Sequence, residues 1–433
     1  MTGDGVTGRV ALVATFGLLV VALAGLATRG TIFAILAVGA ALGLTVVCVL
    51  GPRLTGALCL IAAMALAPLD DIRPGETSLL NASDMAVAVG FALLVPTMMR
   101  RRAHVPGLYL LGVAVLLTAV LLSSAMASNP TESFMLAIRL LIAAVMLPLA
   151  FAWWSPPTRW VNALCWGYVG GQVVSTVYGL TLGGTVHGRH VGLTRHPNYY
   201  GLAAMVAVAL CIYLHHRTPR EYRWVVWVAG GICLYGGLVS GSRASTLGLI
   251  ALVLMVVMIE RSVLSAWWVL SGGLTLALTL QWLVDYLGPG SAVARILPGD
   301  YGASLSDQHR NITLEIYWDQ FLASPLLGNG FTNEQFEAHN AYLQIAVALG
   351  VVGLAGFLMI GWSLMRPLFA RGDRRALCYV AVSYAVVAPV TPSVWDRIVW
   401  VGLALGILAS VPDTDPQQSD HDRTEFSPAK ETT

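Results

Sequence analysis

The chain has 433 residues, of which 57% are hydrophobic and only 11% are charged. A soluble domain ordinarily carries about 25% charged residues, so this composition excludes a water-soluble fold of ordinary type. The formal net charge of +2 supplies no clustered basic face. We therefore expect no nucleic acid among the partners.

Apolar runs recur along most of the chain, and a helix of about 20 apolar residues spans a hydrocarbon layer of about 30 Å. We predict an all-α fold, a polytopic transmembrane bundle of about 12–14 helices with membrane lipid as its solvent. The predicted helices, which lie between polar breaks, cover residues 10–28, 31–50, 54–69, 84–99, 107–127, 136–154, 160–182, 197–214, 224–240, 243–259, 264–287, 340–365, 375–391 and 394–412.

The polar breaks between these runs lie alternately on the two sides of the membrane, and the two sides differ in their number of arginines. With the N-terminus inside, Arg9 and the cytoplasmic breaks hold fourteen arginines, whereas the opposite breaks hold nine. This bias follows the positive-inside rule, so we expect both termini in the cytoplasm. Residues 1–413 then form a multi-pass domain of the cytoplasmic (inner) membrane, and 414–433, rich in Asp, Gln, Ser, Thr and Pro, form a disordered cytoplasmic tail.

The longest polar break, residues 288–338, is a large extracytoplasmic loop in this topology. Apolar and aromatic residues between Ile312 and Leu322 have the spacing of an amphipathic helix that lies on the membrane surface. The SPLLGNGF that follows predicts a turn, because it combines Pro with two glycines. The loop is therefore long enough to fold and partly helical.

Three arginines that lie against the positive-inside trend stand out. Arg189 and Arg195 occur in HGRHVGLTRHPNYY, and Arg243 lies in SGSRAS, a very short turn between two apolar runs. A guanidinium held at the membrane surface loses hydration and needs a partner, and its fork matches a phosphate or a carboxylate. The alternative is that each arginine snorkels to lipid headgroups.

His339 occurs in EAHNAYLQ, where the long loop re-enters the membrane. A neutral imidazole there can accept a proton near neutral pH, and the following Asn340 can orient substrate hydroxyls. The alternative for His339 is a purely structural histidine. Arg310 also has a purely structural alternative. Together with Glu315 and Asp319, it would then form only the charged face of a surface helix.

Three histidines in one segment, His187, His190 and His196, suggest a metal site. Their spacing is not one that a helix fixes, and no carboxylate nearby completes a ligand set. We therefore expect no metal ion and no other cofactor.

Four short pieces of sequence occur in a fixed order on the outer side of this topology. They are R-x-x-G followed by P-N (Arg189, Gly192, Pro197, Asn198), the S-R turn (Ser242, Arg243), Arg310 followed by a Trp and P-L-x-G-x-G (Trp318, Pro325, Leu326, Gly328, Gly330), and H-N (His339, Asn340) followed by the G-x-x-G of LGVVG. Over roughly residues 160–365 the chain thus resembles the O-antigen ligase and polymerase family. These are membrane glycosyltransferases that take a glycan from undecaprenyl diphosphate outside the cytoplasmic membrane.

The resemblance implies a fold similar to the class C glycosyltransferases and roles for several residues. Arg189 and Arg243 would hold the diphosphate of a polyprenyl-diphosphate-linked glycan donor, and His339 would act as base toward a hydroxyl of a lipid or glycan acceptor. Neither a nucleotide sugar nor a metal would be needed. Arg195 and His196 are extra charges relative to the family, which leaves open which arginine meets phosphate. The predicted substrate-binding residues are Arg310, Asn198, Asn340 and Arg195.

Two other functions fit parts of the sequence. A transporter or flippase for a lipid-linked saccharide or a small anion would also need many helices, but such proteins usually place charge at the midplane of the bilayer. Here the ionisable residues cluster at one surface, which favours chemistry there. A purely structural scaffold would explain the helices but not the arginines and the histidine.

Overall fold

The computed structural model describes residues 43–72, 81–261, 263–287, 291, 294–295, 301–332 and 339–412. The expected helix 10–28, most of 31–50 and the predicted tail 414–433 lie outside the described residues. The described part is a bundle of helices, so the predicted all-α class is confirmed. Its only described strands are the two-residue pair β1 (Thr185–Val186) and β2 (Arg189–His190), which are antiparallel.

The helices follow the apolar runs closely. They are α3 (Pro52–Leu66), α4 (Ala82–Met98), α5 (Gly107–Met126), α6 (Pro130–Leu141), α7 (Leu147–Trp154), α8 (Thr158–Thr181), α9 (Pro197–Arg217), α10 (Arg223–Val239), α11 (Arg243–Glu260), α12 (Val263–Leu287), α14 (Tyr301–Ala323), α15 (Ala341–Met365), α16 (Tyr379–Val387) and α17 (Arg397–Ala404). Short π or 3-10 segments extend some of them, namely η1 (Ile142–Met146), η2 (Arg220–Tyr222), η3 (Arg366–Phe369), η4 (Arg375–Cys378), η5 (Ala388–Val390) and η6 (Leu405–Ser410).

Six helical stretches within the described residues are long and apolar enough to cross a membrane, so the chain is a multi-pass membrane protein. One of them, formed by α6, η1 and α7, starts at Pro130 rather than at the expected residue 136. The polar first turn hides this start from a search for apolar runs. Asn129 caps it, because its side chain accepts a hydrogen bond from the Glu132 amide at 3.3 Å.

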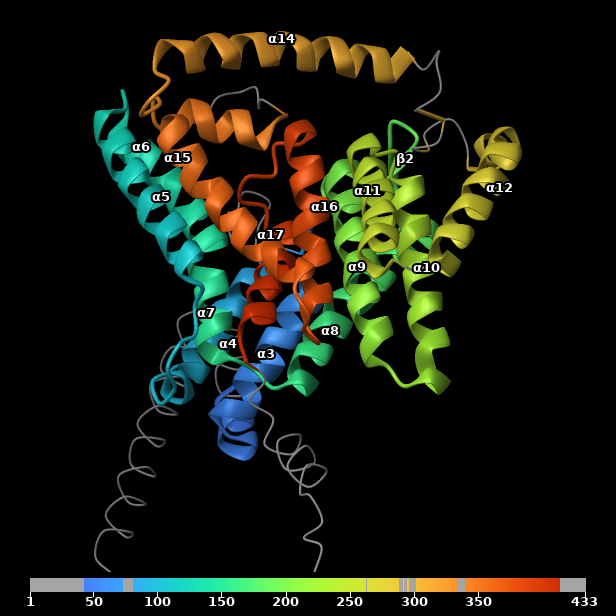
Figure 1. Ribbon diagram of the computed structural model, residues 1–433, viewed down its shortest axis with the longest axis horizontal. Coiled ribbons are helices and arrows are strands. Elements are labelled where there is room, and N and C mark those ends of the chain that lie inside the picture. The colour runs from blue at the N-terminus through green and yellow to red at the C-terminus, as the bar shows by residue number, and fades with distance from the viewer. Residues whose placement is uncertain are drawn as a thin grey trace, which may run out of the picture.

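The polar breaks meet at two opposite ends of the bundle. At one end Arg374 donates to the Pro156 carbonyl at 3.3 Å, and Arg375 pairs with Glu260 at 2.7 Å. These residues belong to the polar breaks at 155–159, 260–261 and 366–375, which are among the breaks that the arginine bias predicts to be cytoplasmic. The helix α14 lies across the other end, over α15 and towards α11 (Figure 1). It is longer than the expected 312–322, because its first half is polar and carries no apolar pattern.

α15 is broken near its start. Gly350 has φ +65° and non-helical geometry, and Figure 1 shows the first turns of α15 beneath α14 before the helix turns into the bundle. The chain after α14 fills this break: the Val351 amide donates to the Pro325 carbonyl at 2.8 Å, and the Gly330 amide donates to Ala348 at 2.9 Å. The turn predicted for SPLLGNGF is therefore present, and it fixes the start of α15.

We expect Gly350→Ala to lower the stability of the folded protein by about 2–3 kcal/mol. The positive φ disfavours any side chain, and an added Cβ would lie 2.1 Å from the Leu326 carbonyl oxygen. The measurement is the thermal unfolding midpoint of the protein purified in detergent. Gly361→Ala on the same helix is the control, because its Cβ would meet nothing within 4 Å. Equal midpoints for the two variants would contradict a structural role for the break.

Candidate active site

Arg189 is presented by the β1–β2 hairpin at the end of the bundle that carries α14. The turn of the hairpin has positive φ at His187 (52°) and Gly188 (72°), which brings Arg189 back towards α9 and α10. Its Nε donates to the Ser240 carbonyl at 2.9 Å, and its Nη2 donates to Asn198 Oδ1 at 2.7 Å. The guanidinium is therefore held by the end of α10 and the start of α9, and Asn198 positions it.

Arg243 is the first residue of α11, directly after a tight turn. The Ser242 side chain caps the helix by accepting from the Ser245 amide at 3.4 Å. Arg243 uses both terminal nitrogens on the carboxylate of Asp307 in α14, with Nη1 2.9 Å from Oδ2. Arg295 reaches the same turn, where it donates to the Gly241 carbonyl at 2.7 Å. The S-R turn is thus a meeting point for side chains from two distant segments.

Four arginines converge at this end. Burial, and then the charges of Arg295, Arg310 and Arg243, lower the pKa of Arg189 to about 10. The pKa of Arg310 is also lowered, by burial and by Arg243 and Arg295. The buried Nε of Arg310 has no hydrogen-bond partner within the described part of the chain. So much positive charge in a half-buried place makes the site suited to an anion with several oxygens.

His339 lies beside these arginines, at the start of α15. The following Asn340 caps the helix, because its Oδ1 accepts from the Leu343 amide at 3.1 Å. Burial, followed by the charges of Arg310 and His309, lowers the pKa of His339 below its ordinary value of 6.5. His339 is therefore neutral near pH 7 and can accept a proton there.

His196 is a second imidazole at the site, which the sequence suggested only as a metal ligand. Loss of hydration, and then the charges of Arg189 and His339, lower its pKa to about 4. Its Nδ1 accepts from the Asn198 amide at 3.1 Å. Because Nδ1 is the acceptor, the proton of the neutral ring is on Nε2, so His196 can donate a hydrogen bond but cannot act as the base.

Arg195 occupies a different position from the other arginines. Its Nε lies 3.5 Å from an oxygen of Asp71, in an ion pair whose side chains are 37% and 59% exposed. Arg195 therefore has a carboxylate partner near the solvent, whereas the half-buried Arg189 is held by neutral oxygens. The expectation that Arg195 binds substrate has no support from this contact.

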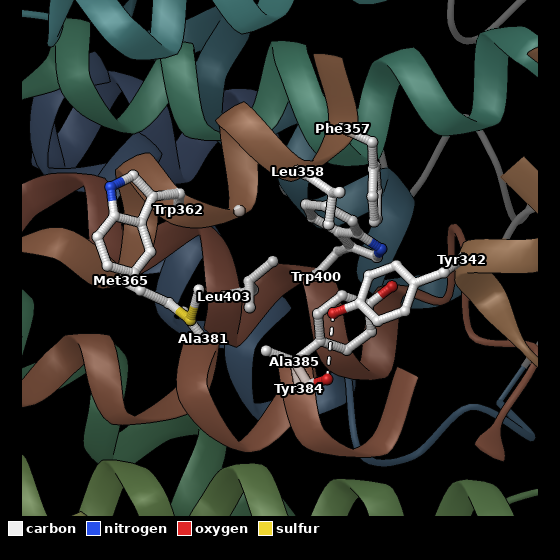
Figure 2. Close-up of a pocket in the computed structure, with 11 residues that line it drawn as sticks. Tyr342, Phe357, Leu358, Trp362, Met365, Ala381, Tyr384, Ala385, Trp400 and Leu403 are labelled. Carbon is white, nitrogen blue, oxygen red and sulfur yellow. Dashed lines mark hydrogen bonds between the residues drawn. The ribbon is translucent and has the colours of Figure 1, made fainter. Parts of the chain in front are cut away.

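Beyond His339 an apolar cavity of about 40 Å³ lies between α15, α16 and α17. Figure 2 shows Tyr342, Phe357 and Trp400 around it, and the Tyr342 hydroxyl donates to the Ala385 carbonyl at 3.1 Å. A water needs about 10–15 Å³ of such space, so the cavity admits a few waters and no sugar. Its aromatic walls instead fix the part of α15 that follows His339.

No family model matches the sequence, and no curated protein matches it. A solved chain from a structure described as "Structural coordination of polymerization and crosslinking by a peptidoglycan synthase complex" aligns with a TM-score of 0.40 and 16% sequence identity. The alignment covers 70% of this chain and 96% of that chain.

Proposed function

We propose that the protein is an O-antigen ligase/polymerase-like glycosyltransferase in the assembly of a cell-surface polysaccharide. It moves a glycan from a polyprenyl-diphosphate carrier to a hydroxyl of a lipid or glycan acceptor on the outer face of the cytoplasmic membrane. The observation that carries the proposal is the group of four arginines beside the neutral His339 at one end of the bundle. Four of these five residues also belong to the ordered sequence pieces, namely Arg189, Arg243, Arg310 and His339.

In this proposal the arginines hold the diphosphate. As the bond between the anomeric carbon and the phosphate oxygen breaks, negative charge grows on that oxygen. Arg189 and Arg243 stabilise this charge, since fixed guanidinium groups in a half-buried site lose little energy to reorientation. Arg310, whose Nε is buried without a partner among the described residues, is placed to add a further contact to the donor.

His339 takes the proton of the acceptor hydroxyl, and the hydroxyl oxygen attacks the anomeric carbon. The new glycosidic bond forms as the polyprenyl diphosphate leaves, so the anomeric centre inverts. Asn340 has its Oδ1 occupied by the Leu343 amide, which leaves its NH2 group to orient a sugar hydroxyl. Asn198 acts one step away, by orienting Arg189.

The test is incubation of the detergent-purified protein with a polyprenyl-diphosphate-linked oligosaccharide and membrane extract from its host. We expect loss of the lipid-linked donor and a glycosylated product, whose size separates a polymerase from a ligase. A transporter would give a different result, namely no donor loss but protein-dependent movement of the intact lipid across a vesicle membrane. That result would contradict the proposal.

We expect donor consumption to continue after treatment with EDTA and without any nucleotide sugar. The reason is that guanidinium groups supply the positive charge that a metal ion would otherwise bring to a diphosphate. The measurement compares initial rates before and after chelation, with re-addition of Mg²⁺ as the control. A loss of activity that Mg²⁺ restores would show that the arginines alone do not carry the diphosphate.

A further inference from the structure

The carboxylate of Asp307 lies on the Arg243 guanidinium, which the proposed function assigns to a phosphate group of the donor. It accepts from both terminal nitrogens of Arg243, with Nη1 to Oδ2 at 2.9 Å. A carboxylate and a phosphate present similar pairs of oxygens to a guanidinium fork, so the two compete for it. Arg243 cannot give both nitrogens to a diphosphate while this pair remains.

The Arg243–Asp307 ion pair also lies where an incoming anion can replace Asp307. The Arg243 side chain is 26% exposed and that of Asp307 is 49% exposed, so an incoming anion can reach both. Hydrogen bonding to Arg243, and then the charges of Arg243, Arg310 and Arg295, lower the pKa of Asp307. Asp307 therefore keeps its negative charge at neutral pH and offers a full charge to its partner.

The rest of α14 keeps Asp307 close to the site when the pair opens. Ten residues further along the helix, Tyr317 is buried against Leu343 and Val347 of α15. Phe321 packs on the same cluster. This apolar contact does not involve Arg243, so it holds α14 on the bundle whether or not Asp307 is paired with Arg243.

We propose that Asp307 is an internal competitor of the donor diphosphate, which holds Arg243 in the empty site and speeds release of the polyprenyl diphosphate product. The proposal rests on the proposed function. Transfer turns a diphosphate diester into a monoester, whose terminal phosphate ionises further, so the arginines hold the product more tightly than the donor. A carboxylate that returns to Arg243 weakens this hold.

The test measures the dissociation constant of inorganic diphosphate for the full-length purified chain. We expect Asp307→Asn to tighten binding by about fivefold, as removal of a part-exposed ion pair with a bidentate fork should. Asp319→Asn is the matched control, because it removes the same charge from an exposed position of the same helix. We expect it to change binding less than about twofold, since exposed charges are screened.

A second pair of variants separates competition from a general charge effect. In an Arg243→Ala background, Asp307→Asn should no longer tighten binding, because the nitrogens for which it competes are gone. Unchanged or weaker binding by Asp307→Asn alone would overturn the proposal and leave the proposed function intact. If wild type failed to bind diphosphate while glycan transfer was present, the competitor role would fail alone. If binding and transfer were both absent, both proposals would fail.

Discussion

Replacement of Arg189 by alanine should lower the rate of glycan transfer by about a hundredfold to a thousandfold, the usual cost of losing one preorganised donor to developing charge. The expected loss is large because this guanidinium is fixed on two sides, by the Ser240 carbonyl and by Asn198. A variant side chain cannot rebuild that arrangement. The measurement is the initial rate of donor consumption at saturating donor.

Two further variants make this result specific. Arg189→Lys keeps the charge but loses the fork, so most of the loss should remain. Arg195→Ala removes an arginine six residues along the chain that is paired with Asp71, and should keep most of the activity. Equal losses of activity in Arg189→Ala and Arg195→Ala would mean that activity depends only on the net charge of this segment. The assignment of Arg189 to the diphosphate would then be wrong.

The fold followed from the sequence where burial in lipid dictates it. An apolar run of about 20 residues has to form a helix, because lipid leaves backbone groups no other partners. The start of α6 at Pro130 was missed, because the polar first turn that Asn129 caps looks like a loop. The break at Gly350 was missed for another reason. It exists because the chain after α14 donates and accepts hydrogen bonds there, and a helical run of sequence does not reveal that contact.

The site followed from the sequence only in part. Arg189 and Arg243 stood out because they lie against the positive-inside trend, and His339 because it lies where the long loop re-enters the membrane. The structure places all three at the same end of the bundle as α14. Asp307 could not be found in this way. It pairs with Arg243 across 64 positions of sequence, and nothing in the polar segment around it marks one carboxylate as a partner.

Replacement of His339 by alanine should lower the rate of transfer by about a hundredfold to ten-thousandfold, the range of general acid–base catalysis. The pH dependence identifies the role. A base is active when neutral, and burial, Arg310 and His309 lower the pKa of His339 below 6.5. Wild-type activity should therefore persist as the pH falls to 6.5 and decline only at lower pH, and the residual activity of His339→Ala should lack this decline.

Arg310→Gln tests the electrostatic origin of that decline. Without the neighbouring positive charge, protonation of His339 becomes easier, so its pKa rises. The acidic limb of the pH–rate profile should then move to higher pH, in addition to any loss of rate from weaker donor binding. Arg371→Gln, which removes an exposed charge from the connection after α15, is the control and should leave the limb in place. If the acidic limb of the pH–rate profile stayed in place in Arg310→Gln, or were still present in His339→Ala, the titrating group would be another residue. A base at His339 requires both that its removal abolishes the limb and that loss of the Arg310 charge moves it.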